Sequence, residues 1–183
     1  MSDLLDLCEP DTPPRVTERQ MLSMLRAKYT KVRRGTNADR YVRAEHVRKV
    51  RVREYDGRQY TYTGEAERIA DLLVLDTYGD TETIGIEVKV SRSDWLCELR
   101  DPTKADAWRL HCHRWYLAVP DTAIVRDDLP EGWGLIAPGK DGQLRVRKQC
   151  PRIADPAPLD QWTAAQLARA IAKTARKEAE VSS

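Results

Sequence analysis

Apolar residues recur at helical spacing in several stretches of the chain. The first stretch follows Thr17 and Gln20, which together form a capping box and therefore predict a helix that begins at residue 17. A second capping box, Ser91 with Asp94, predicts a helix that ends near residue 99. Three more helices are predicted over residues 41–47, 101–111 and about 162–180.

Other stretches alternate between apolar and polar residues or are short apolar runs, as strands do. Residues 49–55 and 58–63 flank Asp56-Gly57, a dipeptide typical of hairpin turns, so a basic β-hairpin insertion is predicted at about 49–63. Five further strands are predicted over residues 69–76, 83–90, 115–119, 134–137 and 144–147. Strands mixed with helices in this order indicate an α/β fold, a mixed central sheet flanked by helices.

Length and composition suit one domain. The chain has 183 residues, of which 41% are hydrophobic, and we assign residues 15–183 to a single domain after an irregular, proline-containing arm at 1–14. No apolar run approaches the length of a membrane span, and no leader pattern opens the chain. We therefore expect a cytoplasmic protein without a membrane partner.

Cysteine and histidine give little sign of a metal site. The four cysteines form no CxxC pair, so reduced and mostly buried thiols are expected. His111 and His113 flank Cys112, but no second ligand cluster accompanies them.

Charge is distributed unevenly along the chain. The formal net charge is +2, yet residues 15–58 contain fourteen basic and five acidic side chains, a local excess of +9. Such a segment is typical of a surface that binds polyphosphate, and DNA is the expected partner. A solvated charged surface without a partner would give the same count.

The richest candidate chemistry lies in two neighbouring predicted strands. Glu87 and Lys89 share one face of the apolar strand 83–90, and Asp71 heads the apolar run of strand 69–76. Carboxylates converging there would be costly to bury unless they pair or bind a cation such as Mg²⁺. The alternative is a wet edge strand on which Glu87 and Lys89 form a weak surface pair.

Asp71 followed by Glu87-Val88-Lys89 resembles the signature of the PD-(D/E)XK nuclease superfamily, whose fold is restriction-endonuclease-like. Residues 68–136 are similar more specifically to the MmcB-like DNA repair family. The matching segments are 69–71, 87–89, 112–120 and 134–136, and the hairpin and the last helix lie outside them. Ala70 stands where the superfamily motif has proline.

The resemblance implies a ligand set and a mechanism. Mg²⁺, for which Mn²⁺ should substitute, would be held by Asp71, Glu87 and the Val88 carbonyl, while Lys89 positions the attacking water. Superfamily members often add a glutamate from the first helix, here Glu18, although an acid in a first helical turn is also favoured by the helix dipole. A lysine on the helix after the second motif, here Lys104, would contact phosphate, unless it is merely solvated.

These residues predict a Mg²⁺-dependent DNA endonuclease or DNA-repair nuclease of a bacterium or its phage, which hydrolyses phosphodiester bonds with a metal-activated water. A non-catalytic DNA-binding module and a junction- or flap-specific resolvase remain alternatives, and RNA remains open as a substrate. A homodimer would favour the resolvase, because two sites must cut two strands. The predicted nucleic-acid contacts are Arg33, Arg34, Lys49, Arg51, Arg53 and Lys104.

Overall fold

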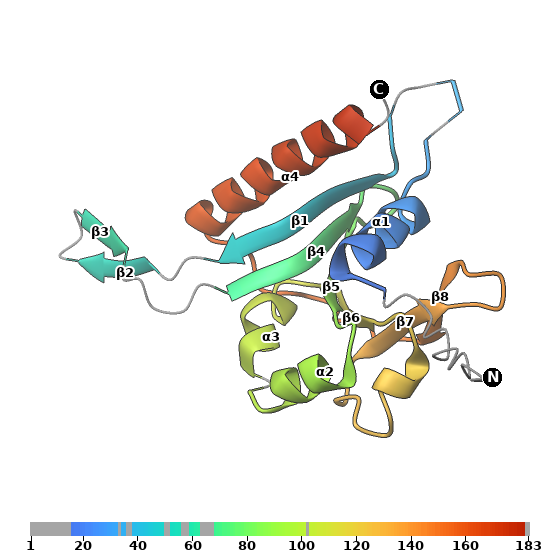
Figure 1. The fold of residues 1–183 in the computed structure, drawn as a ribbon. Coiled ribbons are helices and arrows are strands. Elements are labelled where there is room, and N and C mark those ends of the chain that lie inside the picture. Colours follow the sequence, from blue (N-terminus) through green and yellow to red (C-terminus); the bar gives the residue numbers. More distant parts are fainter. Residues whose placement is uncertain are drawn as a thin grey trace, which may run out of the picture.

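A six-stranded mixed sheet forms the centre of the protein in the computed structural model (Figure 1). The structure describes residues 16–32, 34–35, 38–49, 52–55, 59–62, 68–101 and 103–181, without the side chains of 52–55, 59–62, 103 and 181. The strands follow the order β1-β4-β5-β6-β7-β8. Their bounds are β1 Tyr41–Lys49, β4 Arg68–Asp76, β5 Glu82–Val88, β6 Arg114–Ala118, β7 Gly134–Pro138 and β8 Leu144–Lys148.

The pairing pattern explains why the sheet is mixed. β1, β4 and β5 pair antiparallel to one another, and so do β7 and β8. β5, β6 and β7 run parallel, with the helices α2 (Arg92–Leu99) and α3 (Thr103–Arg109) in the connection between β5 and β6. The described chain is therefore an α/β fold, as the sequence predicts.

Four α-helices cover the two faces of this sheet (Figure 1). α1 (Glu18–Lys28) packs Met21, Leu22 and Leu25 on one face, against residues of β4 and β5. α2, α3 and α4 (Gln161–Val181) cover the opposite face, and α4 also contacts the edge strand β1 along its length. Apolar residues thus fill both faces of the sheet.

The short helix predicted over residues 41–47 is wrong, because this segment forms the strand β1. Residues 41–45 and 47–49 of the strand pair with β4 in an antiparallel register. Its charged side chains obscure the strand pattern, since they pair with residues distant in sequence: Arg43 with Glu178, and Glu45 with Arg26 and Lys177. Long-range pairing decided the local structure here.

The predicted antiparallel hairpin is confirmed, but its strands begin later than expected, at Val52 and Gln59. β2 (Val52–Tyr55) pairs antiparallel with β3 (Gln59–Tyr62), and Tyr55 lies opposite Gln59. Lys49, which was placed in the hairpin, ends β1 instead. The predicted turn at Asp56-Gly57 and the predicted arm at 1–14 lie outside the described residues.

The remaining predicted elements are confirmed, with ends that differ by at most two residues. The capping box at Thr17 is present in full: its side chain accepts from the Gln20 N–H, and its own N–H donates to the Gln20 side chain at 2.8 Å. None of the described helices is long and apolar enough to cross a membrane.

Candidate active site

Asp71 lies where β4 and β5 separate. Leu72 is the first residue of β4 that pairs with β5, and its partner is Ile86. Beyond this point the Val88 N–H donates to Asp71 Oδ2 at 2.7 Å, so a side chain replaces the backbone ladder. The carboxylate is therefore fixed between the two strands, as the sequence motif requires.

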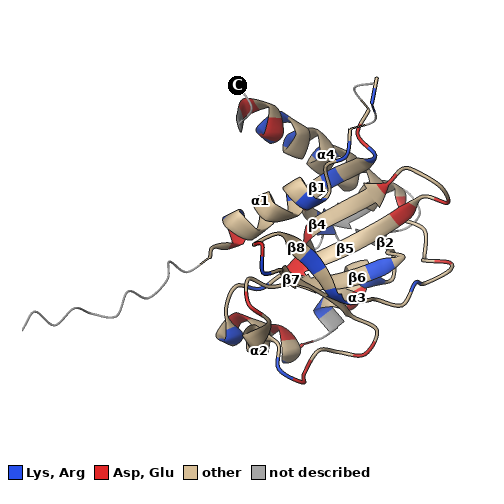
Figure 2. Cartoon of the chain, turned by 90° about the vertical axis from the view of Figure 1, so that its right-hand side faces the viewer, with Lys and Arg blue, Asp and Glu red and all other residues tan. Residues whose placement is uncertain are grey.

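Glu87 and Lys89 of the second motif meet beside this fork. Lys89 Nζ donates to Glu87 Oε1 at 2.8 Å and lies 3.2 Å from Glu98 Oε2, which comes from α2. The three side chains are only 11–12% exposed. Figure 2 shows acidic and basic segments meeting at the carboxyl end of β5. The wet surface pair considered from the sequence is excluded.

Glu98 is a residue that the sequence interpretation missed. It lies three positions after the buried Trp95, on the side of α2 that packs against the sheet. A glutamate in that position signals a buried charge that needs a partner, and Lys89 provides it.

The electrostatics of the two central carboxyls are unusual. Burial and the nearby Glu18 raise the pKa of Asp71 to about 6, against the opposing effects of the Val88 N–H and Lys89. Burial and then the charge of Asp71 raise the pKa of Glu87 to about 8. Burial would lower the pKa of Lys89, but the surrounding carboxylates outweigh burial and raise it, so Lys89 remains an ammonium. Carboxylates therefore outnumber the cations that neutralise them.

Two further groups reach Asp71 from the other side. Glu18, in the first turn of α1, and His46, in β1, have ligand atoms that lie within 4.8 Å of each other and of an Asp71 oxygen. The structure thus brings Glu18 to the predicted place, and it adds His46, which the sequence interpretation did not include. Both side chains are about half exposed, so this side of the site is open to solvent.

A cavity of about 260 Å³ adjoins the buried side of the cluster. Glu87, Glu98 and Lys104 contribute to its wall, so the structure places Lys104 beside the predicted catalytic residues. The Trp115 side chain also lines it, and Trp115 Nε1 is buried without a hydrogen-bond partner among the described residues.

The predicted nucleic-acid contacts have different surroundings. Arg34 is exposed in the loop between α1 and β1. Lys49 is half-buried and committed internally, since its Nζ donates to the Ala107 carbonyl at 2.7 Å and lies 2.7 Å from His111 Nε2. Its amine ties β1 to α3 and is not free to reach a phosphate as predicted. Arg33, Arg51 and the side chain of Arg53 lie outside the described residues.

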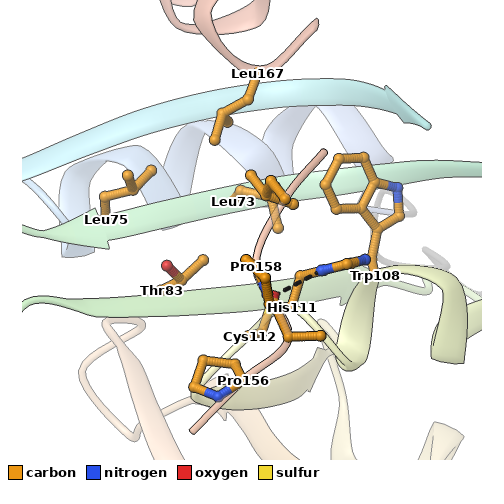
Figure 3. Close-up of a pocket in the computed structure, with 11 residues that line it drawn as sticks. Leu73, Leu75, Thr83, Trp108, His111, Cys112, Pro156, Pro158 and Leu167 are labelled. Atoms are coloured by element: carbon orange, nitrogen blue, oxygen red, sulfur yellow. Dashed lines mark hydrogen bonds between the residues drawn. The ribbon is translucent and has the colours of Figure 1, made fainter. Parts of the chain in front are cut away.

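The His-Cys-His segment serves packing. His113 Nδ1 accepts the Thr83 N–H at 3.0 Å, and burial raises the pKa of Cys112 to about 12. Figure 3 shows His111 and Cys112 on the wall of a second, mainly apolar cavity of about 220 Å³, where His111 Nδ1 lies 2.8 Å from the Ala157 carbonyl. These contacts engage one ring nitrogen of each histidine with the backbone of a neighbouring segment.

Comparisons with known proteins give a fold and no family. No protein-family model matches the chain, and no curated protein matches it. The chain is similar in structure to SPO1766, a protein of unknown function from Silicibacter pomeroyi, with a TM-score of 0.52. The two chains are 19% identical, and the match covers 90% of each. At this identity the likeness shows a shared fold alone.

Proposed function

We propose that this protein is a metal-dependent nuclease that hydrolyses phosphodiester bonds of DNA on a restriction-endonuclease-like fold of the PD-(D/E)XK type. One observation carries the proposal: Asp71, Glu87 and Glu98 converge at the fork of β4 and β5 around a single ammonium group, that of Lys89. A fold gains nothing from such an excess of buried carboxylates unless a cation completes it.

The donor set suits a divalent cation. Asp71 and Glu87 supply carboxylate oxygens, the ligands that Mg²⁺ and Mn²⁺ prefer, and their raised pKa values mark two groups that lack positive charge. Asp71, Glu87 and the Val88 carbonyl would hold the ion. When bound, it would polarise the scissile phosphate and lower the pKa of a water molecule.

The protein side chains have separable roles in this proposal. Lys89 is held as an ammonium, so it orients the attacking water and stabilises negative charge at the phosphate instead of acting as a free base. Glu98 is its second partner, at 3.2 Å. If Glu87 turns toward a cation, Glu98 keeps Lys89 in place, which makes Glu98 a positioning residue.

DNA is supported as the substrate by charge. The segment 15–58, which has the basic excess, includes α1 and β1. These two elements bring Glu18 and His46 close to Asp71. Lys104, on the cavity wall beside Glu87, is the described lysine best placed to meet a phosphate.

The test is cleavage of labelled single-stranded, duplex, flap and four-way-junction DNA in Mg²⁺, Mn²⁺ or EDTA. Asp71→Asn keeps the size of the side chain and an acceptor for the Val88 N–H but removes the charge, and Asp141→Asn is a matched control at an exposed hairpin. We expect metal-dependent cleavage that Asp71→Asn abolishes and Asp141→Asn preserves. Binding without cleavage in every condition would replace the nuclease with a DNA-binding module.

A further inference from the structure

His46 interrupts the strand on which it lies. The β1–β4 register pairs Glu45 with Leu72 and Val47 with Ala70, and it leaves His46 out. The backbone of His46 has φ 51°, in the left-handed region that non-glycine residues rarely enter. The interruption therefore lies opposite Asp71, the residue between Leu72 and Ala70.

The interruption changes which side chains face the site. Ala44 and Val47 belong to the same buried core cluster, although residues three apart in a regular strand point to opposite faces. His46 lies between them, and its left-handed backbone conformation lets both side chains reach the same core. His46 is 46% exposed instead of buried, and its Nδ1 lies 3.9 Å from Glu18 Oε1.

The spacing of the three donors suits one small cation. Donors about 2.1 Å from a shared ion lie roughly 3 Å apart when adjacent and roughly 4.2 Å apart when opposite. The Glu18–His46 separation of 3.9 Å falls within these limits, and the separations of the three ligand atoms, which reach at most 4.8 Å, exceed the upper limit by no more than about 0.6 Å. Glu18 and His46 are solvent-accessible, so a small rotation of either side chain closes the set.

We propose that His46 is a nitrogen ligand of the divalent cation, together with Asp71 and Glu18, and that it gives the site a preference for Mn²⁺ or another first-row transition ion over Mg²⁺. The inference rests on the proposed function, because it concerns the same metal centre. Imidazole binds transition ions well, whereas Mg²⁺ prefers an all-oxygen environment. A carboxylate at position 46 would have served Mg²⁺ better.

A simpler explanation is that His46 only occupies the left-handed position and pairs with Glu18 when protonated. The variant His46→Asn separates the two explanations. Asparagine enters the left-handed region as readily as histidine does, so the strand should keep its shape, but it carries no imidazole nitrogen. His111 and His113 remain in this variant, so any nitrogen signal that disappears must come from His46.

The experiment uses the full chain with Mn²⁺ alone, measured by pulsed electron paramagnetic resonance for coupling to ¹⁴N. We expect histidine nitrogen coupling in the wild type and none in His46→Asn, with an unchanged circular dichroism spectrum. Calorimetric titrations should show that the ratio of Mn²⁺ to Mg²⁺ affinity falls by about tenfold or more in the variant. Absence of coupling in the wild type, its survival in the variant, or failure to bind Mn²⁺ would each overturn the inference.

The outcome separates this inference from the proposed nuclease. A protein that shows the coupling but cuts none of the DNA substrates would keep His46 as a ligand and refute the nuclease. A protein that cuts DNA and shows no coupling would keep the nuclease and refute the role of His46.

Discussion

Buried carboxylates occur in two regions of this protein, and the two regions treat them differently. Glu45 in β1 and Asp76 in β4 represent the first region; they are 5% and 9% exposed and accept hydrogen bonds from basic side chains. Glu87 is as buried, at 9%, but lies at the fork with Asp71. The carboxylates of the two regions are thus buried to a similar extent but differ in the basic side chains that pair with them.

Arginine and lysine satisfy the carboxylates in the first region. Glu45 accepts from Arg26 and from Lys177 Nζ, the latter at 2.7 Å, and Asp76 accepts from both sides of the Arg40 guanidinium. Burial would raise the pKa of Glu45, but the hydrogen bonds from Lys177 and Arg26 outweigh it and lower the pKa. The hydrogen bonds from Arg40 likewise lower the pKa of Asp76.

The fork is compensated only in part, because Lys89 is shared between Glu87 and Glu98, and the pKa values of Asp71 and Glu87 are both raised. The difference teaches that this chain can neutralise a buried carboxylate fully with its own cations and does so only in part at the fork. Stability is therefore given up at one place, which is typical of functional sites.

The largest expected effect is on the cleavage rate, and it differs between Lys89 at the fork and Lys177, which pairs with Glu45. Lys89→Ala should lower the cleavage rate by about 10²–10⁴-fold, because it removes the group that orients water, while DNA affinity stays nearly unchanged. Lys177→Ala, which removes a partner of Glu45, should leave the cleavage rate near the wild-type value. Single-turnover cleavage and fluorescence anisotropy check both, and equal losses in the two variants would contradict the distinction.

The second prediction concerns stability. Glu45→Gln should lower the free energy of unfolding by about 3 kcal/mol near pH 7, because it leaves Arg26 without its buried partner. Asp141→Asn, at the exposed pair with Arg145, is the control and should leave stability almost unchanged. Urea titrations measure both, and a small effect at Glu45 would show that its pairing is not stabilising.

The third prediction concerns the pH dependence of stability at the fork, where the pKa of a buried carboxyl is raised instead of lowered. In EDTA, native Glu87 keeps its proton up to about pH 8, whereas unfolded Glu87 loses it near its ordinary pKa of 4.5. The native state binds more protons between these values, so the stability of the wild type should fall as pH rises from 5 to 8. Glu87→Gln should reduce that fall by at least about 1 kcal/mol. If the stability of the wild type and of Glu87→Gln depended on pH in the same way, the proton retained by the native state would belong to a group other than Glu87.

The fourth prediction tests Glu98 as the holder of Lys89. Glu98→Gln should weaken Mn²⁺ binding by about tenfold, because Lys89 then competes more strongly for Glu87. Glu98→Asp, which keeps the charge, should recover part of the affinity. Calorimetry measures the affinities, and an unchanged Glu98→Gln would leave that residue without a role at the metal.

The smallest expected effect is on DNA affinity. Lys104→Ala should weaken binding uniformly across DNA sequences and reduce the slope of affinity against salt by about one. Lys173→Ala, at an exposed position on α4, is the control and should change neither. Equal effects of the two variants would make Lys104 an ordinary surface lysine.

The core of the site could be predicted because its signals are local. Glu87 and Lys89 interrupt an apolar strand, Asp71 heads another, and the register of two adjacent strands brings them together. The helices at Thr17 and Ser91 were predictable for a similar reason, since capping needs only residues three apart.

The rest depends on contacts distant in sequence. The sequence of β1 looks polar because it contains Arg43 and Glu45. These side chains form ion pairs with residues of α4 and α1 that are distant in sequence. His46 reaches the site through a left-handed backbone conformation that no neighbouring residue signals. The sequence predicted that Lys49 binds DNA, but in the structure the Ala107 carbonyl of α3 accepts a hydrogen bond from its amine.

The central claim is that the incompletely neutralised carboxyls at the fork form a divalent-metal centre. Anomalous diffraction from a crystal of the wild-type protein soaked in Mn²⁺, recorded near the manganese absorption edge, locates the ion directly. The account predicts an anomalous peak within coordination distance of the Asp71 and Glu87 carboxylates. A crystal whose fork shows no such peak, with Glu87 still paired to Lys89, would contradict it.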